Sequence, residues 1–116
     1  MNEHFTSKVS ILLKHENPVA EALNYKELSE DYTTRWCGPK LKSLSKDKGY
    51  GKILLGIYNN PGFSKQKIRE TLQLRAQCNE MFQCMSHMKM IHNIRGKGYF
   101  ITELGIALLY HFKLLD

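Results

Sequence analysis

The chain has 116 residues and a formal net charge of +6, and 42% of its residues are hydrophobic. That apolar content suits one globular domain, or two very small ones that share a core, and is too high for a disordered chain. No run approaches the roughly 18 consecutive apolar residues of a membrane span, and no signal-peptide pattern opens the chain. We therefore expect a cytoplasmic protein with no membrane segment, whose three cysteines are reduced and mostly buried.

The positive charge belongs to the second part of the chain. Residues 1–47 contain seven basic and seven acidic side chains, whereas residues 48–116 contain ten Lys and Arg and four acidic residues. The whole net charge of +6 thus lies in residues 48–116. A one-sided basic excess favours a polyanionic partner such as nucleic acid, which the acid-rich block at 16–31 would repel.

Residues 1–51 predict an N-terminal helical segment. Apolar side chains recur at helical spacing in residues 5–15, and Asn17-Pro18 ends that stretch because the residue before proline avoids helical dihedrals. The next predicted elements are short helices at 19–23 and 25–32, a turn at 33–38, and a helix at 39–48 that Gly49-Tyr50-Gly51 ends.

Residues 52–116 predict a second domain with the order helix, helix, turn, helix, hairpin, helix. Ser64 and Thr102 are well placed to cap the N-termini of two of these helices, and Gly96 supplies the positive φ of a tight hairpin turn. The predicted elements are helices at 52–59, 65–72, 76–90 and 103–115, with a hairpin at 91–102. The expected fold class is mostly α with a small β-hairpin (α+β).

This order is that of a helix-turn-helix followed by a hairpin. The second helix of such a pair enters the major groove of DNA, and the first braces it across the backbone. In the helix at 76–90, Cys78, Phe82 and Met85 have the spacing of buried anchors. The residues between the anchors face outward and suit contacts to bases or phosphates: Arg75, Gln77, Asn79, Glu80 and Gln83.

The segment Tyr99-Phe-Ile-Thr102-Glu-Leu-Gly105-Ile-Ala-Leu-Leu109 resembles part of the winged helix-turn-helix superfamily of small bacterial and archaeal regulators. Their wing strand and following helix often read aromatic-x-Leu-Thr-x-x-Gly-x-x-Leu-Leu. The resemblance covers residues 52–115 and implies a wing at 91–102. It also implies that the wing tip, Arg95-Gly96-Lys97-Gly98, touches phosphate or the minor groove, and two cations on a glycine turn suit that contact.

We therefore expect a DNA-binding transcriptional regulator, a homodimeric repressor that inserts the helix at 76–90 in the major groove. The helix at 76–90 carries few cations, so affinity depends on the wing and on Lys65, Lys67, Arg69 and Arg75. The expected DNA-binding residues are Ser64, Lys65, Lys67, Arg75, Gln77, Asn79, Glu80, Gln83, Arg95 and Lys97.

The last predicted helix, at 103–115, has almost no polar face, so a second copy of the chain is expected to cover part of it. The alternative cover is the N-terminal helix at 5–15. The expected dimer interface consists of Phe5, Leu12, Leu109, Tyr110, Phe112 and Leu114.

Two other interpretations stay open. Because the presumed recognition helix is poor in cations, the same surface also suits a winged-helix protein-interaction module of phage or mobile-element origin. In addition, Ser10-Ile-Leu-Leu and the later Asn17-Pro18 resemble Lys52-Ile-Leu-Leu and the later Asn60-Pro61. That echo indicates a degenerate tandem helix-turn-helix, which would bind DNA as a monomer.

No motif for catalysis, a cofactor or a metal is visible. Trp36-Cys-Gly-Pro-Lys40 has a lysine where a thioredoxin-type redox motif needs its resolving cysteine. Cys84 and His87 could share a metal, and Cys78 and Cys84 could form an oxidation switch, but packing of these cysteines in the core is the favoured interpretation. We expect no enzymatic activity, no cofactor and no metal site.

Overall fold

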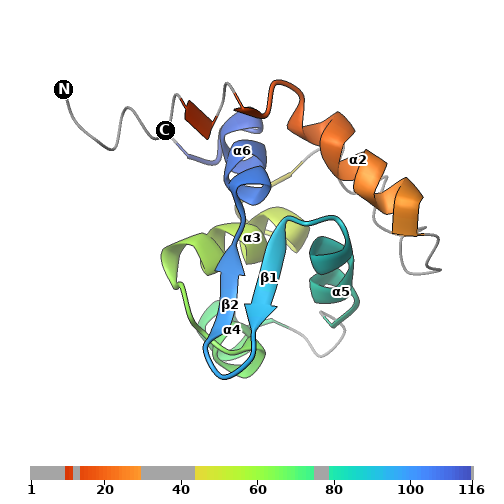
Figure 1. Ribbon diagram of the computed structural model, residues 1–116. Helices are drawn as coiled ribbons and strands as arrows, with labels where there is room; N and C mark the ends of the chain where they lie inside the picture. Colours follow the sequence, from red (N-terminus) through yellow and green to blue (C-terminus); the bar gives the residue numbers. More distant parts are fainter. Residues whose placement is uncertain (1–9, 12–13, 30–43, 75–78, 116) are drawn as a thin grey trace.

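The computed structural model describes residues 10–11, 14–29, 44–74 and 79–115. In that part of the chain, five helices and one two-stranded antiparallel hairpin form an α+β fold, which confirms the predicted fold class at this level (Figure 1). The elements are α2 (Pro18–Ser29), α3 (Gly49–Asn59), α4 (Lys65–Leu72), α5 (Asn79–His87), β1 (Ile91–Ile94), β2 (Gly98–Ile101) and α6 (Glu103–His111). None of the described helices is long and apolar enough to cross a membrane.

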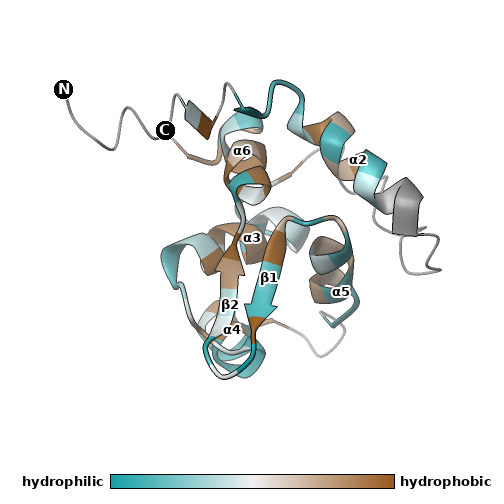
Figure 2. Ribbon diagram, in the orientation of Figure 1, coloured by the Kyte–Doolittle hydropathy of each residue, from teal (hydrophilic) through white to brown (hydrophobic). Residues whose placement is uncertain are grey.

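Helix α3 lies at the centre of the core and contacts α4, α5, α6 and β2. Figure 2 shows apolar residues along α3, α6 and the part of the hairpin nearest to them. Burial of each large apolar side chain contributes about 1.5–3 kcal/mol. The fully buried large side chains are Ile53, Leu54, Ile57, Ile68, Phe82, Met85, Met88, Met90, Ile91, Leu108 and Leu109. Burial and the nearby Glu80 raise the pKa of Tyr50, also in this core, to about 12, so its phenol stays neutral.

The hairpin is fixed to the segment that joins α3 to α4. Tyr99 donates its backbone N–H to the Phe63 carbonyl, and Gly62 donates its N–H to the Tyr99 carbonyl, each at 2.9 Å. Gly98 has φ +97°, and a Cβ atom there would lie 2.3 Å from the Gly62 carbonyl oxygen. Only glycine allows this close approach of two backbones. The contact sets the direction in which the hairpin leaves the core.

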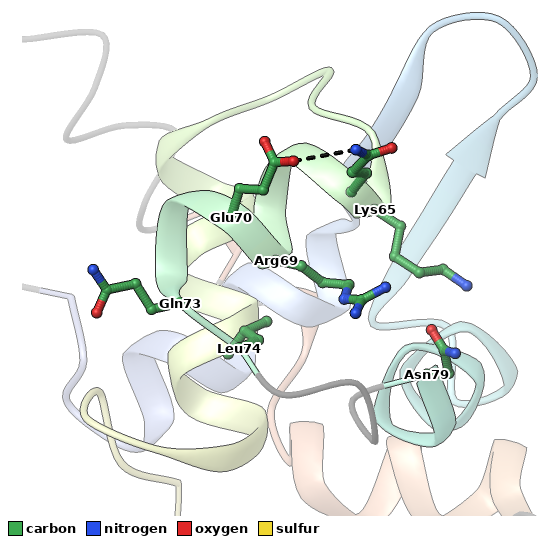
Figure 3. A pocket seen from close by; sticks show the side chains of 7 residues that line it. Lys65, Arg69, Glu70, Gln73, Leu74 and Asn79 are labelled. Carbon is green, nitrogen blue, oxygen red and sulfur yellow. Dashed lines mark hydrogen bonds between the residues drawn. The ribbon is translucent and has the colours of Figure 1, made fainter.

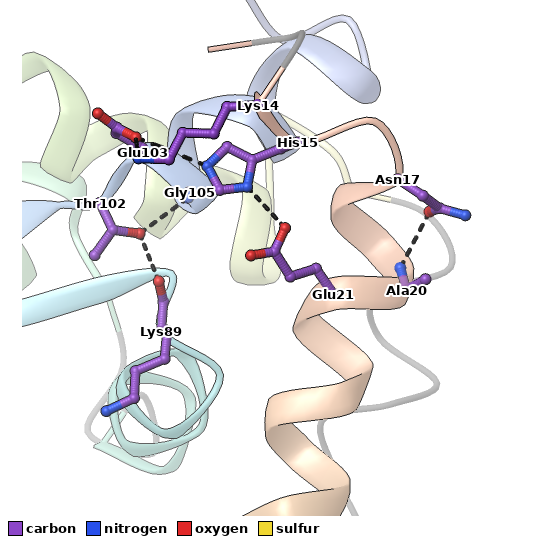
Figure 4. Close-up of polar contacts among 9 residues, drawn as sticks. All are labelled: Lys14, His15, Asn17, Ala20, Glu21, Lys89, Thr102, Glu103 and Gly105. Carbon is purple, nitrogen blue, oxygen red and sulfur yellow. Dashed lines mark hydrogen bonds and ion pairs between the residues drawn. The ribbon is translucent and has the colours of Figure 1, made fainter.

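Two helices begin at the predicted residues because side chains cap their N-termini. Ser64 caps α4 by accepting the Lys67 N–H at 3.2 Å, and Thr102 caps α6 by accepting the Gly105 N–H at 3.0 Å (Figure 4). The predicted hairpin is also confirmed, with Ile91 opposite Ile101 and a turn that contains Gly96 at φ +81°. Helices α5 and α6 end earlier than predicted, since Lys89 and Lys113 adopt positive φ angles of 60° and 61°.

The N-terminal part differs from the predicted succession of short helices. Ser10, Ile11 and Lys14 are helical, as expected for the stretch at 5–15, whose other residues except His15 lie outside the described part. Residues 19–23 and 25–29 are helical as predicted, but the division into two helices was wrong, because α2 runs without a break from Pro18 to Ser29; residues 30–32 lie outside the described part. Asn17 caps this helix by accepting the Ala20 N–H at 3.1 Å, and Pro18 occupies the first position, where no N–H is needed.

The helix predicted at 39–48 is wrong in its described part. Leu44–Lys48 is not helical: Ser45 and Lys48 form an isolated bridge, and Ser45 Oγ accepts the Asp47 N–H at 3.1 Å. Gly49-Tyr50-Gly51 begins α3 instead of ending a helix, and a Cβ atom on Gly51 would lie 2.2 Å from the Ser45 carbonyl oxygen. The tandem interpretation requires residues 1–51 to repeat the helix, turn and helix of the second domain. The continuous α2 and the non-helical Leu44–Lys48 do not follow that pattern.

Cys84 is buried on α5 and is disulfide-bonded, so the expectation of reduced thiols is wrong for this residue. Cys37 and Cys78 lie outside the described residues. A disulfide-bonded Cys84 offers no thiolate that could bind a metal together with His87.

Candidate nucleic-acid interface

Two pockets lie beside α4 and share Lys65. The hairpin pocket, of about 450 Å³, separates the start of α4 from the hairpin tip and is lined by Gly62, Ser64, Lys65, Asn93, Gly96, Lys97, Gly98 and Tyr99. The helix pocket, of about 760 Å³, lies between α4 and the start of α5 (Figure 3). Its described lining consists of Lys65, Gln66, Arg69, Glu70, Gln73, Leu74 and Asn79. The two pockets meet at Lys65, one of them toward the hairpin tip and the other toward α5.

The helical repeat of α4 and the hairpin turn place cations beside these pockets. Lys65 and Arg69 are four residues apart, so they lie one above the other on the same side of α4. Gln73 then ends α4 in the left-handed conformation, at φ 56°. Lys97 reaches the hairpin pocket from the hairpin turn. We call Lys65, Lys67, Arg69, Arg95 and Lys97 the basic surface.

The cations of the basic surface make no ion pair with any described residue. The contacts between acidic and basic side chains among the described residues lie instead near α2 and α6. Lys14 pairs with Glu103 at 2.6 Å, and the His15 ring lies 2.7 Å from the Glu21 carboxylate and 3.9 Å from that of Glu103 (Figure 4). Lys65 and Lys67 place their Nζ atoms 5.9 Å and 5.1 Å from the ring centroids of Phe82 and Phe63. A group of cations without counter-ions creates a positive potential that attracts polyanions.

The acidic side chain that lines the helix pocket does not pair with the basic surface. Glu70 lines the helix pocket, but its carboxylate accepts a hydrogen bond from Gln66 Nε2 at 3.1 Å. Figure 3 shows Glu70 pointing away from the Arg69 guanidinium, on the other side of α4. In the hairpin pocket, burial raises the pKa of Tyr99, so its hydroxyl stays neutral there.

The structure brings together five of the predicted DNA-binding residues. Ser64, Lys65 and Lys97 line the hairpin pocket, Asn79 lines the helix pocket, and Lys67 is exposed on α4 beside them. Arg95, also exposed, precedes Gly96 in the hairpin turn. The predicted outward positions Glu80 and Gln83 are exposed on α5, whereas Arg75 and Gln77 lie outside the described residues.

One residue of the predicted dimer interface is fully buried within the single chain. Leu109 has no exposed surface in the single chain, because α6 packs against both α2 and α3. Tyr110, Phe112 and Leu114 are partly exposed, and Phe5 and Leu12 lie outside the described residues. The one large hydrophobic side chain classed as exposed in the described part is Ile94, 36% exposed beside the hairpin turn.

Two features of the surface were not predicted from the sequence. Gly62 and Phe63, between the predicted helices at 52–59 and 65–72, were given no contact with the hairpin, yet they hold it beside α4. Arg69 was counted as one of several cations, whereas its Nε atom is buried, with no hydrogen-bond partner in the described part of the chain. The four-residue spacing of Lys65 and Arg69 in the sequence could have predicted that they share one side of α4. Their proximity to Asn79 could not be predicted, because it depends on how α5 packs.

No protein-family model, no curated protein and no solved structure matches this chain. Within the described ranges, no group of three or more His, Cys, Asp or Glu side chains could hold a metal ion. The function is therefore inferred from the geometry and charge of the basic surface.

Proposed function

We propose that this chain is a winged-helix protein that binds duplex DNA and acts as a transcriptional regulator. The observation that carries this proposal is the basic surface, whose five cations lie on α4 and the hairpin turn and make no ion pair in the described part of the chain. Lys and Arg that neutralise DNA phosphates release counterions, which supplies most of the affinity for nucleic acid.

The order of the elements supports the same proposal. Helices α4 and α5 are the helix-turn-helix pair, the hairpin β1–β2 is the wing, and Gly62–Phe63 borders β2 as a short edge segment. Helix α5 exposes Asn79, Glu80 and Gln83, which suit hydrogen bonds to base edges. In this arrangement α4 and the wing bind the phosphate backbone, and α5 reads the bases.

A repressor that reads two half-sites needs two copies of the protein, so we include a homodimer in the proposal. Tyr110, Phe112 and Leu114, at the end of α6 and just after it, are partly exposed. A second copy of the chain could therefore pack against them. Sedimentation equilibrium, without DNA and then with it, measures this part of the proposal separately. A mass of one chain per duplex would contradict the homodimer and leave DNA binding by the single chain.

Affinity for a random duplex, measured across a salt series, tests DNA binding. We expect log K to fall steeply with log salt concentration, with a slope of about −0.9 for each phosphate contact. The variant Arg95→Glu/Lys97→Glu should weaken binding to all sequences, whereas Lys46→Glu/Lys113→Glu changes the same net charge at exposed sites away from the basic surface. Absence of binding at low salt would contradict the proposal.

A protein-interaction module is the second candidate, and Ile94 is the observation that favours it. This side chain is 36% exposed next to the hairpin turn, where an apolar contact with another protein could form. The salt series separates the two candidates, since a module that binds only proteins shows no affinity for duplex DNA at low salt.

A further inference from the structure

We propose that the helix pocket binds a single phosphoryl group, with Arg69 as the principal ligand and Lys65 and Asn79 as additional ligands. This inference deepens the proposed function and rests on it for the source of the group, which is one phosphate of the DNA backbone. It assigns a specific binding site to a residue that the sequence identified only as one of several cations.

The first argument is the hydrogen-bonding state of Arg69. The Nε atom of its guanidinium is buried, and none of the described residues accepts a hydrogen bond from it. Neither does any described carboxylate form an ion pair with this side chain. Buried donors in folded proteins are almost always paired, so a donor that no described residue pairs, beside a pocket, is suited to an acceptor that a ligand supplies.

The second argument is the direction of the neighbouring side chains. Figure 3 shows the Arg69 side chain on the side of α4 that faces the start of α5, with its guanidinium pointing toward the ends of the Lys65 and Asn79 side chains. The pocket that these residues line has a volume of about 760 Å³, which admits a phosphate together with the sugar atoms that carry it. Glu70 lines the same pocket, but Gln66 holds its carboxylate on the opposite side.

The chemistry of the three side chains matches a phosphoryl group. A guanidinium presents two parallel N–H donors to two oxygens of a phosphate, and a nearby ammonium adds a point charge. The Asn79 amide can donate a further hydrogen bond. A phosphate held in this way would bridge α4 and the start of α5, and it would set the position of α5 relative to the DNA backbone.

The test uses the full-length wild-type protein and two matched pairs of variants. NMR follows the Arg69 Nε–Hε signal of the wild type while either a random 20-base-pair duplex or inorganic phosphate is added. Duplex affinity is measured for Arg69→Gln and Lys67→Gln, which each remove one charge from α4, and for Arg69→Lys and Lys67→Arg, which keep it. Lys67 is the control, because it is exposed on the same helix and does not line the pocket.

We expect both additions to shift the Arg69 signal, and we expect Arg69→Lys and Arg69→Gln to weaken duplex binding on the order of tenfold. The two Lys67 variants should lose less than about threefold, as for a single exposed charge. Thermal unfolding of each variant shows whether it is folded, and the wild-type NMR arm does not depend on any variant.

Failure of this inference differs from failure of the proposed function. If the duplex binds but the Arg69 signal stays unchanged and the Arg69 and Lys67 variants behave alike, the phosphoryl site is overturned and DNA binding stands. If no duplex binds at low salt but phosphate shifts the Arg69 signal, the site stands with a free phosphate as its source, and the proposed function fails. If neither addition has an effect, both fail.

Discussion

The two ends of the molecule differ in whether their charged side chains are paired. At the end formed by α2 and α6, the Lys14 ammonium pairs with Glu103, and the ring of His15, only 8% exposed, is within hydrogen-bond distance of the Glu21 carboxylate. At the end formed by α4 and the hairpin turn, the cations of the basic surface have no described counter-ion (Figure 1). Charges that are paired within the chain belong to the fold, whereas a cluster left unpaired is available to a ligand.

The cations of α4 repel one another along the helix. Like charges four residues apart on a helix, such as Lys65 and Arg69, destabilise it by about 0.2–0.5 kcal/mol. Helix α4 is only eight residues long and also carries Lys67. The contacts of Lys65 and Lys67 with the Phe82 and Phe63 rings offset this repulsion, and a polyanion bound to the basic surface would offset it further.

The largest expected effect tests whether α6 belongs to the core of the single chain. Leu109→Ala should lower the free energy of unfolding by about 2–5 kcal/mol, because the removed atoms leave a cavity in a fully buried site. Leu114→Ala, at a partly exposed position, should cost clearly less. Urea denaturation measures both. A Leu109→Ala variant that is as stable as the wild type but has altered self-association would contradict the internal packing of α6.

The next prediction concerns how the hairpin is held against α4. Gly98→Ala should cost about 1–3 kcal/mol in unfolding free energy, because its new Cβ atom meets the Gly62 carbonyl and its φ is positive. Gly96→Ala is the control, since its φ is also positive but its Cβ atom has no neighbour within 4 Å. Equal losses in the two variants would show that the contact with Gly62 adds nothing to the backbone strain.

The next prediction tests whether the cations of the hairpin turn serve DNA binding and not the stability of the fold. Arg95→Gln/Lys97→Gln should leave the unfolding free energy within about 0.5 kcal/mol, since both side chains are exposed and make no described ion pair. The slope of log K for duplex DNA against log salt should become shallower by about 0.9 for each lost phosphate contact. An unchanged slope would place these cations outside the interface.

The smallest expected effect concerns the Lys14–Glu103 ion pair, at the end formed by α2 and α6. The hydrogen bond and the charge of Lys14 lower the pKa of Glu103 from its ordinary value of 4.5. A carboxylate with a lowered folded-state pKa stabilises the protein above pH 4.5, and this contribution disappears as the pH falls through the folded-state pKa. Lys14→Met should therefore reduce the acid sensitivity of the melting temperature slightly, as expected for an exposed pair.

Melting curves at neutral pH and at pH values below the ordinary Glu pKa measure this small difference. Lys113→Met, which removes an exposed lysine that makes no described ion pair, is the control. If the two variants respond to acid in the same way, the Lys14–Glu103 pair contributes nothing to the pH dependence.

The sequence predicted best those elements whose start depends on a few neighbouring residues. Ser64 and Thr102 begin α4 and α6 where expected, since each hydroxyl accepts an N–H three residues away. The outward positions of Asn79, Glu80 and Gln83 were also predicted, because the helical repeat separates them from the buried Phe82 and Met85. The predicted sites at Arg75 and Gln77 lie outside the described residues.

The predictions failed where a contact between distant segments sets the local conformation. Gly49-Tyr50-Gly51 has the composition of a helix end, yet it begins α3, with Tyr50 buried and Gly51 against the backbone of Ser45. A second copy was expected to cover Leu109, because the sequence does not show that α2 and α3 already cover α6.

The sequence by itself determined the caps, the hairpin turn and the one-sided charge, which all follow from residue types at short spacing. Only the tertiary structure decided that Gly62 and Phe63 hold the hairpin, and that Arg69 and Asn79 line the same pocket. The physical reason is that side-chain chemistry and helical repeats act over a few residues, whereas burial and convergence depend on which distant elements pack together.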